Sequence, residues 1–230
     1  MTKAIIDAPS PNHDDRGGQY IDILLIHYTG MLSGPEALAR LCDPAAKVSA
    51  HYLIEEDGRL FKLVDEDRRA WHAGVAHWDG ASDINARSIG IELVNPGHEF
   101  GYRAFPKSQM ACLTELSKEL ISRHAIPAHR VLGHSDVAPA RKEDPGELFD
   151  WAGLAADGVG LWPQEPLEAG GKPDNDRVAR LLQGYGYGLD GQPIATVVTA
   201  FQRHFQPGSL TGQADSQTIG ILEALLALKK

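Results

Sequence analysis

The chain has 230 residues, 43% of them hydrophobic and 23% charged, so it can bury a substantial core as one large domain or two. Its formal net charge of −9 argues against nucleic acid or an anionic membrane as the main partner. Residues 1–20 lack the apolar stretch of a secretory signal, and no segment is long enough to span a bilayer, so we expect a cytoplasmic protein.

The first predicted elements alternate between strand and helix. Residues 21–28 form a continuous apolar run, typical of a central strand that is covered on both faces. Residues 34–41 predict a short helix with a proline near its start. The apolar runs 48–54 and 60–64 flank Asp57-Gly58, and Asp-Gly between two such runs predicts a β-hairpin.

Three further elements follow the hairpin. Residues 88–94 predict another strand, and residues 106–124 predict a helix with one apolar stripe. Residues 130–132 predict a short strand. The alternation of strands and helices predicts an α/β fold, and the hairpin makes its central sheet mixed, with helices flanking it.

The composition changes near residue 163. Three prolines and two glycines within residues 163–173 predict a linker. Three apolar stretches follow it, at 178–182, 196–205 and 218–228, and they predict a small all-α domain of three helices. The expected organisation is a first domain at 1–162, a linker at 163–175 and a helical domain at 176–230.

Two histidines and a carboxylate are candidates for a metal site. His27 ends the first predicted strand, and His134 follows another strand within a segment too rich in Pro and Gly for a regular helix. Asp144 and Asp136 are the competing carboxylates, although Asp136 is better placed to cap the loop backbone. Two histidines, one carboxylate and an open fourth position form the ligand set of a catalytic zinc.

A zinc hydrolase also needs a group that moves protons. Glu92 lies on the opposite face of its strand from Ile89, Ile91 and Leu93, and a carboxylate there is costly unless it is paired or catalytic. The alternative is a salt bridge from Glu92 to an arginine such as Arg87. Lys142 lies two residues before Asp144, where an ammonium could stabilise an oxyanion, and the alternative is an exposed loop lysine.

The chain from about residue 20 to 162 resembles the zinc-dependent N-acetylmuramoyl-L-alanine amidases of the type 2 amidase family, which includes T7-type lysozymes and peptidoglycan recognition proteins. The resemblance rests on five ordered motifs, at residues 26–29, 48–54, 70–74, 88–92 and 133–146. It implies one zinc per chain bound by His27, His134 and Asp144, with Glu92 and Lys142 assisting catalysis. The implied reaction is hydrolysis of the amide between N-acetylmuramic acid and L-alanine.

The substrate would be peptidoglycan or a muropeptide. We expect five residues to contact it: His51, Trp71, His72, Asn95 and Arg141. For His51 and His72, a packing role is the alternative. The C-terminal helices resemble the three-helix peptidoglycan-binding module of wall hydrolases, through motifs at 178–183, 188–191, 200–205 and 210–215.

Two other functions stay open, a recognition protein that binds peptidoglycan without cutting it and a zinc peptidase or deacetylase acting on the same wall. The complete ligand set, together with Glu92 and Lys142, favours the amidase over a binder. The chain lacks the His-Glu-x-x-His motif of many zinc peptidases. We expect a monomer, and the resemblance to a wall-binding module makes the cell envelope the alternative location.

Overall fold

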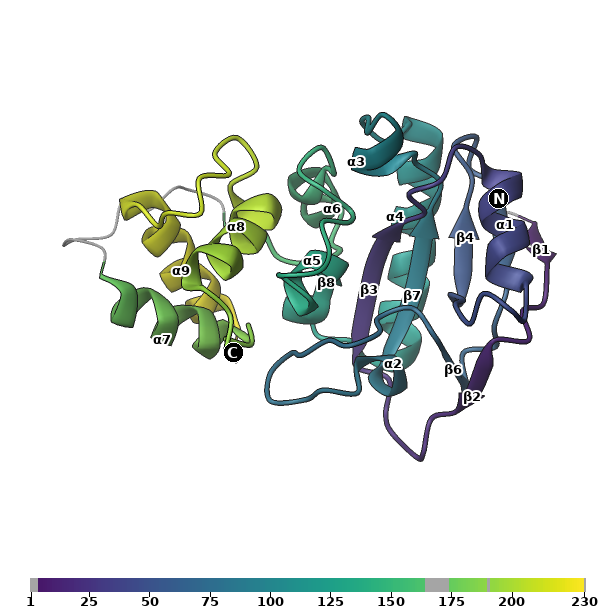
Figure 1. The fold of residues 1–230 in the computed structure, drawn as a ribbon, viewed down its shortest axis with the longest axis horizontal. Coiled ribbons are helices and arrows are strands. Elements are labelled where there is room, and N and C mark those ends of the chain that lie inside the picture. Colours follow the sequence, from purple (N-terminus) through teal and green to yellow (C-terminus); the bar gives the residue numbers. More distant parts are fainter. Residues whose placement is uncertain (1–3, 164–173, 190, 230) are drawn as a thin grey trace.

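The computed structural model describes residues 4–163, 174–189 and 191–229 (Figure 1). Its centre is a six-stranded sheet in the order β1-β5-β4-β7-β3-β8. In that order the strands are Ile5–Asp7, Leu60–Lys62, Tyr52–Ile54, Ser88–Leu93, Ile23–Tyr28 and Val131–Gly133. Strands β4, β7, β3 and β8 are parallel, whereas β5 is antiparallel to β4, so the sheet is mixed as the sequence predicts.

The two longest strands, β3 and β7, lie side by side in the middle of the sheet. They arise from the apolar runs that predict them, and residues 23–27 are buried as expected of a strand covered on both faces. The predicted hairpin is also present. Gly58 has a φ of +84°, a conformation that favours glycine, and its amide donates to the carbonyl of Glu55 over 2.8 Å.

A separate pair of short strands lies beside the main sheet. Strand β2 (His13–Asp15) pairs antiparallel with β6 (Arg68–Ala70). Neither strand is predicted from the sequence, nor is the edge strand β1, because each has three residues and no run of alternating apolar side chains.

Helix α4 (Lys107–His124) covers one face of the main sheet. Its buried residues Leu113, Leu116 and Leu120 share a hydrophobic cluster with Ile89 and Ile91 of β7. The other helices before residue 163 are α1 (Gly34–Cys42), α2 (Ile84–Arg87), α3 (Gly97–Phe100), η1 (Ala128–Arg130), α5 (His134–Val137) and α6 (Trp151–Ala156).

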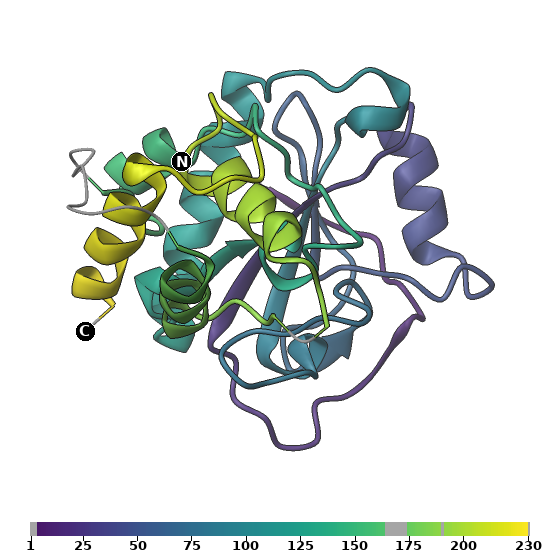
Figure 2. The same cartoon turned by 60° about the vertical axis from the view of Figure 1, so that its left-hand side comes forward.

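Three helices follow, α7 (Asn175–Tyr185), α8 (Ile194–Phe205) and α9 (Ser216–Leu228). They lie beside α5 and β8, and a turn of the view brings α8 across the front of the sheet (Figures 1 and 2). Helices α7 and α9 begin earlier than their apolar patterns predict, because Asp174 and Asp215 cap their N-termini. Most of the predicted linker (residues 164–173), and Asp190 of the predicted module motif, lie outside the described residues.

One hydrophobic cluster continues from the sheet into these C-terminal helices. Neighbouring strand residues point to opposite faces. Leu24 and Ile26 therefore join the cluster beneath α4, whereas Ile23 and Leu25 belong to a cluster that includes residues of α7, α8 and α9. The C-terminal helices and the sheet thus share one core.

Within the described residues, no helix combines the length and apolar character that crossing a membrane requires.

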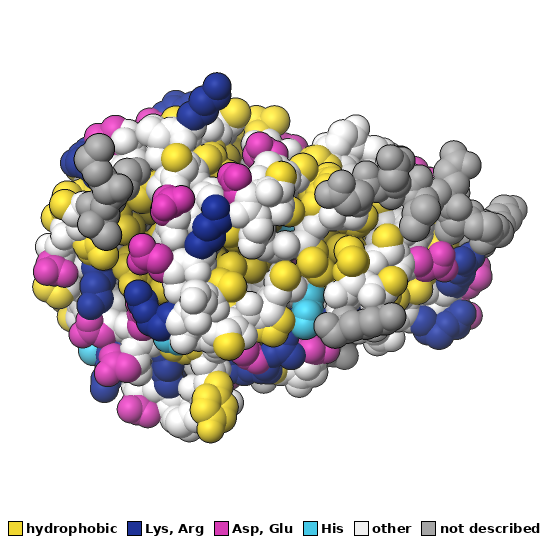
Figure 3. Space-filling model, turned by 180° about the vertical axis from the view of Figure 1, so that it is seen from behind, with side chains coloured by type: hydrophobic (Ala, Val, Ile, Leu, Met, Phe, Trp, Pro, Cys, Tyr) yellow, Lys and Arg dark blue, Asp and Glu magenta, His cyan; other side chains and the backbone are white. Residues whose placement is uncertain are grey.

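On the face seen in Figure 3, acidic and basic side chains are interspersed rather than gathered by sign. Cys112 lies on the buried face of α4, and Cys42 is partly buried at the end of α1.

Candidate metal centre and active site

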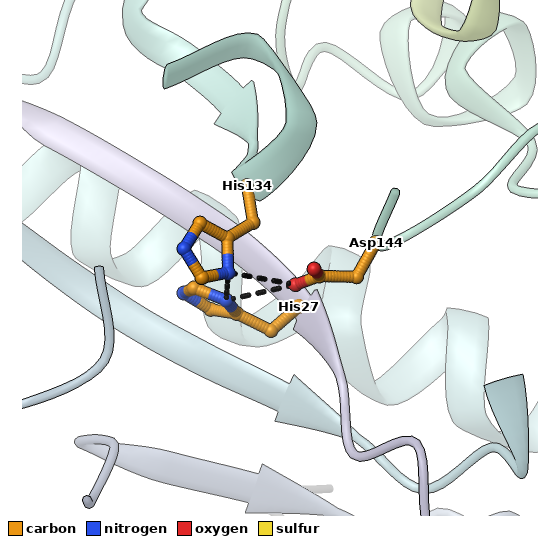
Figure 4. A group of neighbouring side chains, drawn as sticks. All are labelled: His27, His134 and Asp144. Carbon is orange, nitrogen blue, oxygen red and sulfur yellow. Dashed lines mark hydrogen bonds and ion pairs between the residues drawn. The ribbon is translucent and has the colours of Figure 1, made fainter. Parts of the chain in front are cut away.

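Three predicted ligands converge at the carboxyl ends of neighbouring parallel strands. His27 is the last residue but one of β3, and His134 begins α5 directly after β8. Because β3 and β8 pair in parallel, their carboxyl ends meet at one edge of the sheet. Asp144 reaches the same point from the loop after α5, and all three side chains are buried (Figure 4).

The donor atoms form a nearly equilateral triangle. Nδ1 of His27 lies 2.9 Å from Nδ1 of His134, and each nitrogen lies 3.0 Å from Oδ2 of Asp144. Ligand atoms in a tetrahedral zinc site are about 3.3 Å apart, so the spacing is close to what zinc requires. Within the described residues, His27, His134 and Asp144 form the one group of three His, Cys, Asp or Glu side chains that could hold a metal ion.

Hydrogen bonds behind the two histidines fix which ring nitrogen faces the centre of the triangle. The Ala73 carbonyl can only accept, so it takes the Nε2–H of His134 over 3.0 Å, and Nδ1 of His134 keeps its lone pair. An unprotonated Nδ1 is the form that binds a metal.

A longer chain of hydrogen bonds fixes His27. The Ser88 hydroxyl donates to the Ile84 carbonyl over 2.7 Å, so its oxygen accepts from Nε2–H of His72 over 3.3 Å. Nδ1 of His72 then accepts from Nε2–H of His27 over 3.0 Å. With its proton on Nε2, His27 has no proton on Nδ1, the nitrogen that faces the candidate metal position.

The electrostatics favour the metal-binding forms of these ligands. Burial, followed by the neighbouring His134, lowers the pKa of His27 to about 4, so the ring is neutral near pH 7. Burial alone would raise the pKa of Asp144, but its contacts with His134 and His27 outweigh this effect and hold that pKa well below its ordinary range. These shifts give His27 as a neutral imidazole and Asp144 as a carboxylate, the forms that bind a metal.

Glu92 lies directly beside this centre, because β3 and β7 place His27 and Glu92 in register. Its Oε2 atom is buried and has no hydrogen-bond partner in the described part of the chain. Burial, and then the nearby Asp144, raise the pKa of Glu92 well above its usual value. The alternative salt bridge is ruled out, since Arg87 instead donates its Nε–H to Asp22 over 3.0 Å.

A cleft of about 480 Å³ opens over the triangle. Glu92, His134, Lys142 and Asp144 border it. Its other lining residues are Tyr28, Thr29, Gly30, Met31, Ala37, Arg40, Leu41, Ala46, Val48, His72, Arg141 and Glu143. Three lining residues are not among the predicted site residues: Tyr28, which ends β3, Met31, which follows it, and Arg40 of α1.

The five residues predicted to contact substrate take different positions. Arg141 and His72 border the cleft, and Arg141 also donates to the carbonyls of Ala73 and Val75, each over 2.7 Å. His72 also contacts His27 through a hydrogen bond of 3.0 Å, so it orients a candidate ligand.

The other three lie away from the cleft lining. His51 is fully buried, and its Nδ1 accepts from the Gly90 amide over 3.0 Å. Asn95 is also fully buried and bridges two loop backbones, donating to the Arg103 carbonyl and accepting from the Gly97 amide. The backbone amide of Trp71 donates to Ser49 Oγ over 2.9 Å. These contacts give His51 and Asn95 structural roles.

Asp136, the competing carboxylate, braces the loop as predicted. Its Oδ2 accepts from the Gly133 amide over 2.7 Å, at the start of α5. Its further partners, Tyr187 and His204, are not predictable from local sequence because they lie 51 and 68 residues away along the chain.

Residues 17–147, which include every candidate ligand and catalytic residue, match the sequence family described as N-acetylmuramoyl-L-alanine amidase. The chain is 39% identical to the N-acetylmuramoyl-L-alanine amidase AmiD of Escherichia coli (strain K12), over 90% of this chain and 82% of AmiD. It is 40% identical to the 1,6-anhydro-N-acetylmuramyl-L-alanine amidase AmpD of Citrobacter freundii, over 61% of this chain and 71% of AmpD.

Solved structures show the same similarity. The AmiD complex with the substrate anhydro-N-acetylmuramic acid-L-Ala-D-gamma-Glu-L-Lys superposes with a TM-score of 0.82 at 37% identity, covering 92% of this chain and 91% of that chain. AmpDh3 from Pseudomonas aeruginosa, in complex with anhydromuramic pentapeptide, also gives a TM-score of 0.82, at 32% identity, covering 94% of this chain and 93% of that chain.

Proposed function

This chain belongs to the N-acetylmuramoyl-L-alanine amidase family, and we propose that it works as a zinc hydrolase of muropeptides, with His27, His134 and Asp144 as the ligands. The bond that it cleaves joins the lactyl carbonyl of N-acetylmuramic acid to the nitrogen of L-alanine. The observation that carries the proposal is the triangle of donor atoms beside Glu92, whose buried Oε2 has no hydrogen-bond partner among the described residues.

A zinc ion bound there supplies Lewis-acid chemistry, polarising a carbonyl and making a water molecule more acidic. Glu92 takes the proton of the attacking water as its oxygen bonds to the carbonyl carbon. Glu92 then delivers that proton to the alanine nitrogen as the carbon–nitrogen bond breaks. The products are the muramic carboxylic acid and a peptide with a new amino terminus, so the atoms balance.

Lys142 acts on the carbonyl oxygen in this scheme. Lys142 borders the same cleft as Glu92. The residue before it, Arg141, is held in place because its side chain donates hydrogen bonds to the carbonyls of Ala73 and Val75. An ammonium at this place stabilises the negative charge that develops on the oxygen.

The substrate class is proposed from the relatives. AmiD and AmpDh3 are described in complexes with anhydromuramic acid peptides. This chain aligns with both over more than nine tenths of its length. We therefore propose that anhydro-muropeptides are among its substrates, while the resemblance of α7 to α9 to a peptidoglycan-binding module stays a prediction.

The test is incubation of the zinc-loaded protein with an anhydro-muropeptide, followed by mass spectrometry. We expect release of a peptide that begins with L-alanine, and loss of release after treatment with chelator. Glu92→Gln should keep its zinc and lose turnover by about 10²-fold or more. Intact substrate after incubation with the zinc-loaded parent would overturn the proposal, and full activity of zinc-loaded Glu92→Gln would remove Glu92 from the mechanism.

A further inference from the structure

The carboxylate of Asp136 is held mainly by the C-terminal helical region. It is fully buried, two residues after the ligand His134. Its Oδ1 accepts from the Tyr187 hydroxyl over 2.6 Å, and its Oδ2 lies 2.7 Å from Nδ1 of His204 in α8. Besides the Gly133 amide, the groups that hydrogen-bond Asp136 thus belong to residues far along the chain.

Aromatic packing holds both donors in place. The His204 ring stacks on Trp151, with ring centres 3.8 Å apart and planes 18° apart. The Tyr187 ring packs edge-on against Trp78 at 4.9 Å, and both residues are buried. Rigid donors of this kind can hold a loop in one geometry, because little motion remains in their side chains.

Helix α8 also approaches the other side of the same loop. Nη2 of Arg203 lies 3.5 Å from Glu143, and its Nε lies 3.7 Å from Glu147. These two glutamates bracket the ligand Asp144. The His204 and Arg203 side chains therefore contact the loop near both of its metal ligands, His134 and Asp144.

We propose that the C-terminal helices are a structural part of the catalytic centre: Tyr187, His204 and Arg203 position the loop 134–147 that carries two zinc ligands and Lys142. Tyr187 and His204 are positioning residues that act through Asp136. The inference rests on the proposed metal site. It gives these helices a role in positioning the loop, which is separate from any contact with peptidoglycan.

The helices that hold Asp136 lie outside the part of the chain that matches the family. The match with AmpD extends over 61% of this chain, whereas the match with AmiD extends over 90%. The match with an amidase of this family can therefore leave more than a third of this chain uncovered. In this chain, Asp136 is bonded by Tyr187 and His204, which both lie outside the family match at residues 17–147.

The experiment compares Tyr187→Phe with Tyr185→Phe in the full-length chain. Both changes remove one hydroxyl from a buried ring in the same core, but only the Tyr187 hydroxyl bonds Asp136. Transfer of zinc to a chromogenic chelator should be about tenfold faster for Tyr187→Phe than for Tyr185→Phe or the parent. His204→Phe, which keeps a ring for stacking on Trp151, should show the same direction of change.

Hydrogen exchange of residues 134–147 in the zinc-free protein gives a readout that needs no metal. We expect faster exchange in Tyr187→Phe than in Tyr185→Phe. Equal zinc transfer and equal loop exchange in Tyr187→Phe and Tyr185→Phe would overturn the inference.

The outcomes separate the two proposals. A parent protein that binds no zinc contradicts the proposed metal site, and the loop exchange then decides the positioning role by itself. If the parent binds zinc, and Tyr187→Phe and Tyr185→Phe release zinc and exchange their loop amides at equal rates, only the positioning role is contradicted. If His204→Phe does not fold, the Tyr187→Phe comparison still decides the question.

Discussion

Glu92 combines three features that rarely occur together in one carboxylate. It sits in a central parallel strand, one of its oxygens has no hydrogen bond within the described residues, and it shares its register with a candidate zinc ligand. Such a group lowers the stability of the folded protein, because ionisation in a buried place is costly. A stability cost at this position is typical of a residue retained for chemistry.

The pKa of Glu92 makes this cost measurable. Because burial raises the pKa in the folded state, that state holds its proton above the unfolded value of about 4.3. Stability is then lost as the pH rises, by up to about 1.4 kcal/mol per pH unit until Glu92 ionises. In zinc-free protein, Glu92→Gln should therefore become increasingly more stable than the parent as the pH increases from 4 toward 7.

Urea unfolding at several pH values tests this expectation. The control is Glu99→Gln, on the exposed end of α3, which should show the same pH dependence as the parent. A constant difference in unfolding free energy between Glu92→Gln and the parent would show that Glu92 has an ordinary pKa in the folded state.

The cluster of His27, His134 and Asp144 could be predicted from sequence because each residue lies near the end of a strand or in a loop with a recognisable motif. Their supporting contacts could not. The partner of His27 is His72, 45 residues away, and the partners of Asp136 lie still farther along the chain. A local pattern contains no information about such contacts, since they depend on how the strands and helices pack.

At the scale of elements, strand β7 makes room for the histidine that orients His27. A Cβ atom on Gly90 would lie 2.5 Å from Cγ of His72, which is closer than real contacts allow. The glycine in this central strand therefore serves a packing purpose, because any side chain here would displace the His72 ring.

We expect Gly90→Ala to lower the unfolding free energy by about 1–3 kcal/mol through overpacking, and to weaken zinc binding. The same change in a His72→Ala background should cost much less stability, because the ring that it collides with is gone. A thermodynamic cycle of the four proteins, measured by urea unfolding and zinc titration, provides the test. Additive effects would show that Gly90 and His72 do not interact.

The elements themselves follow the sequence where apolar patterns are long. Strands β3 and β7 and helix α4 match their predictions to within about two residues. The boundaries of α7 and α9 differ because the capping aspartates precede the apolar residues that mark the helix. The exposed edge strand β1 is defined by its partner β5 rather than by its own residues, so no local signal identifies it.

At the scale of the molecule, the shared core connects stability with function. Ile23 and Leu25 of β3 contribute to the same cluster as Phe201 of α8 and Leu222 of α9. His27 follows Leu25 by two residues on that strand, so the packing of the C-terminal helices and the position of a ligand depend on the same side chains.

This shared core predicts that the chain unfolds as one cooperative unit. Native-state hydrogen exchange in increasing urea should give the same opening free energy for the slowest amides of β3 and of α8. Leu222→Ala should lower both values together, by about 2–5 kcal/mol, because it leaves a cavity in the cluster that joins them. Val75→Ala, at an exposed position, should change neither. If α8 opens at lower urea than β3, or if Leu222→Ala weakens α8 alone, the C-terminal helices unfold as a separate unit, and their packing cannot set the stability of the strand that carries His27.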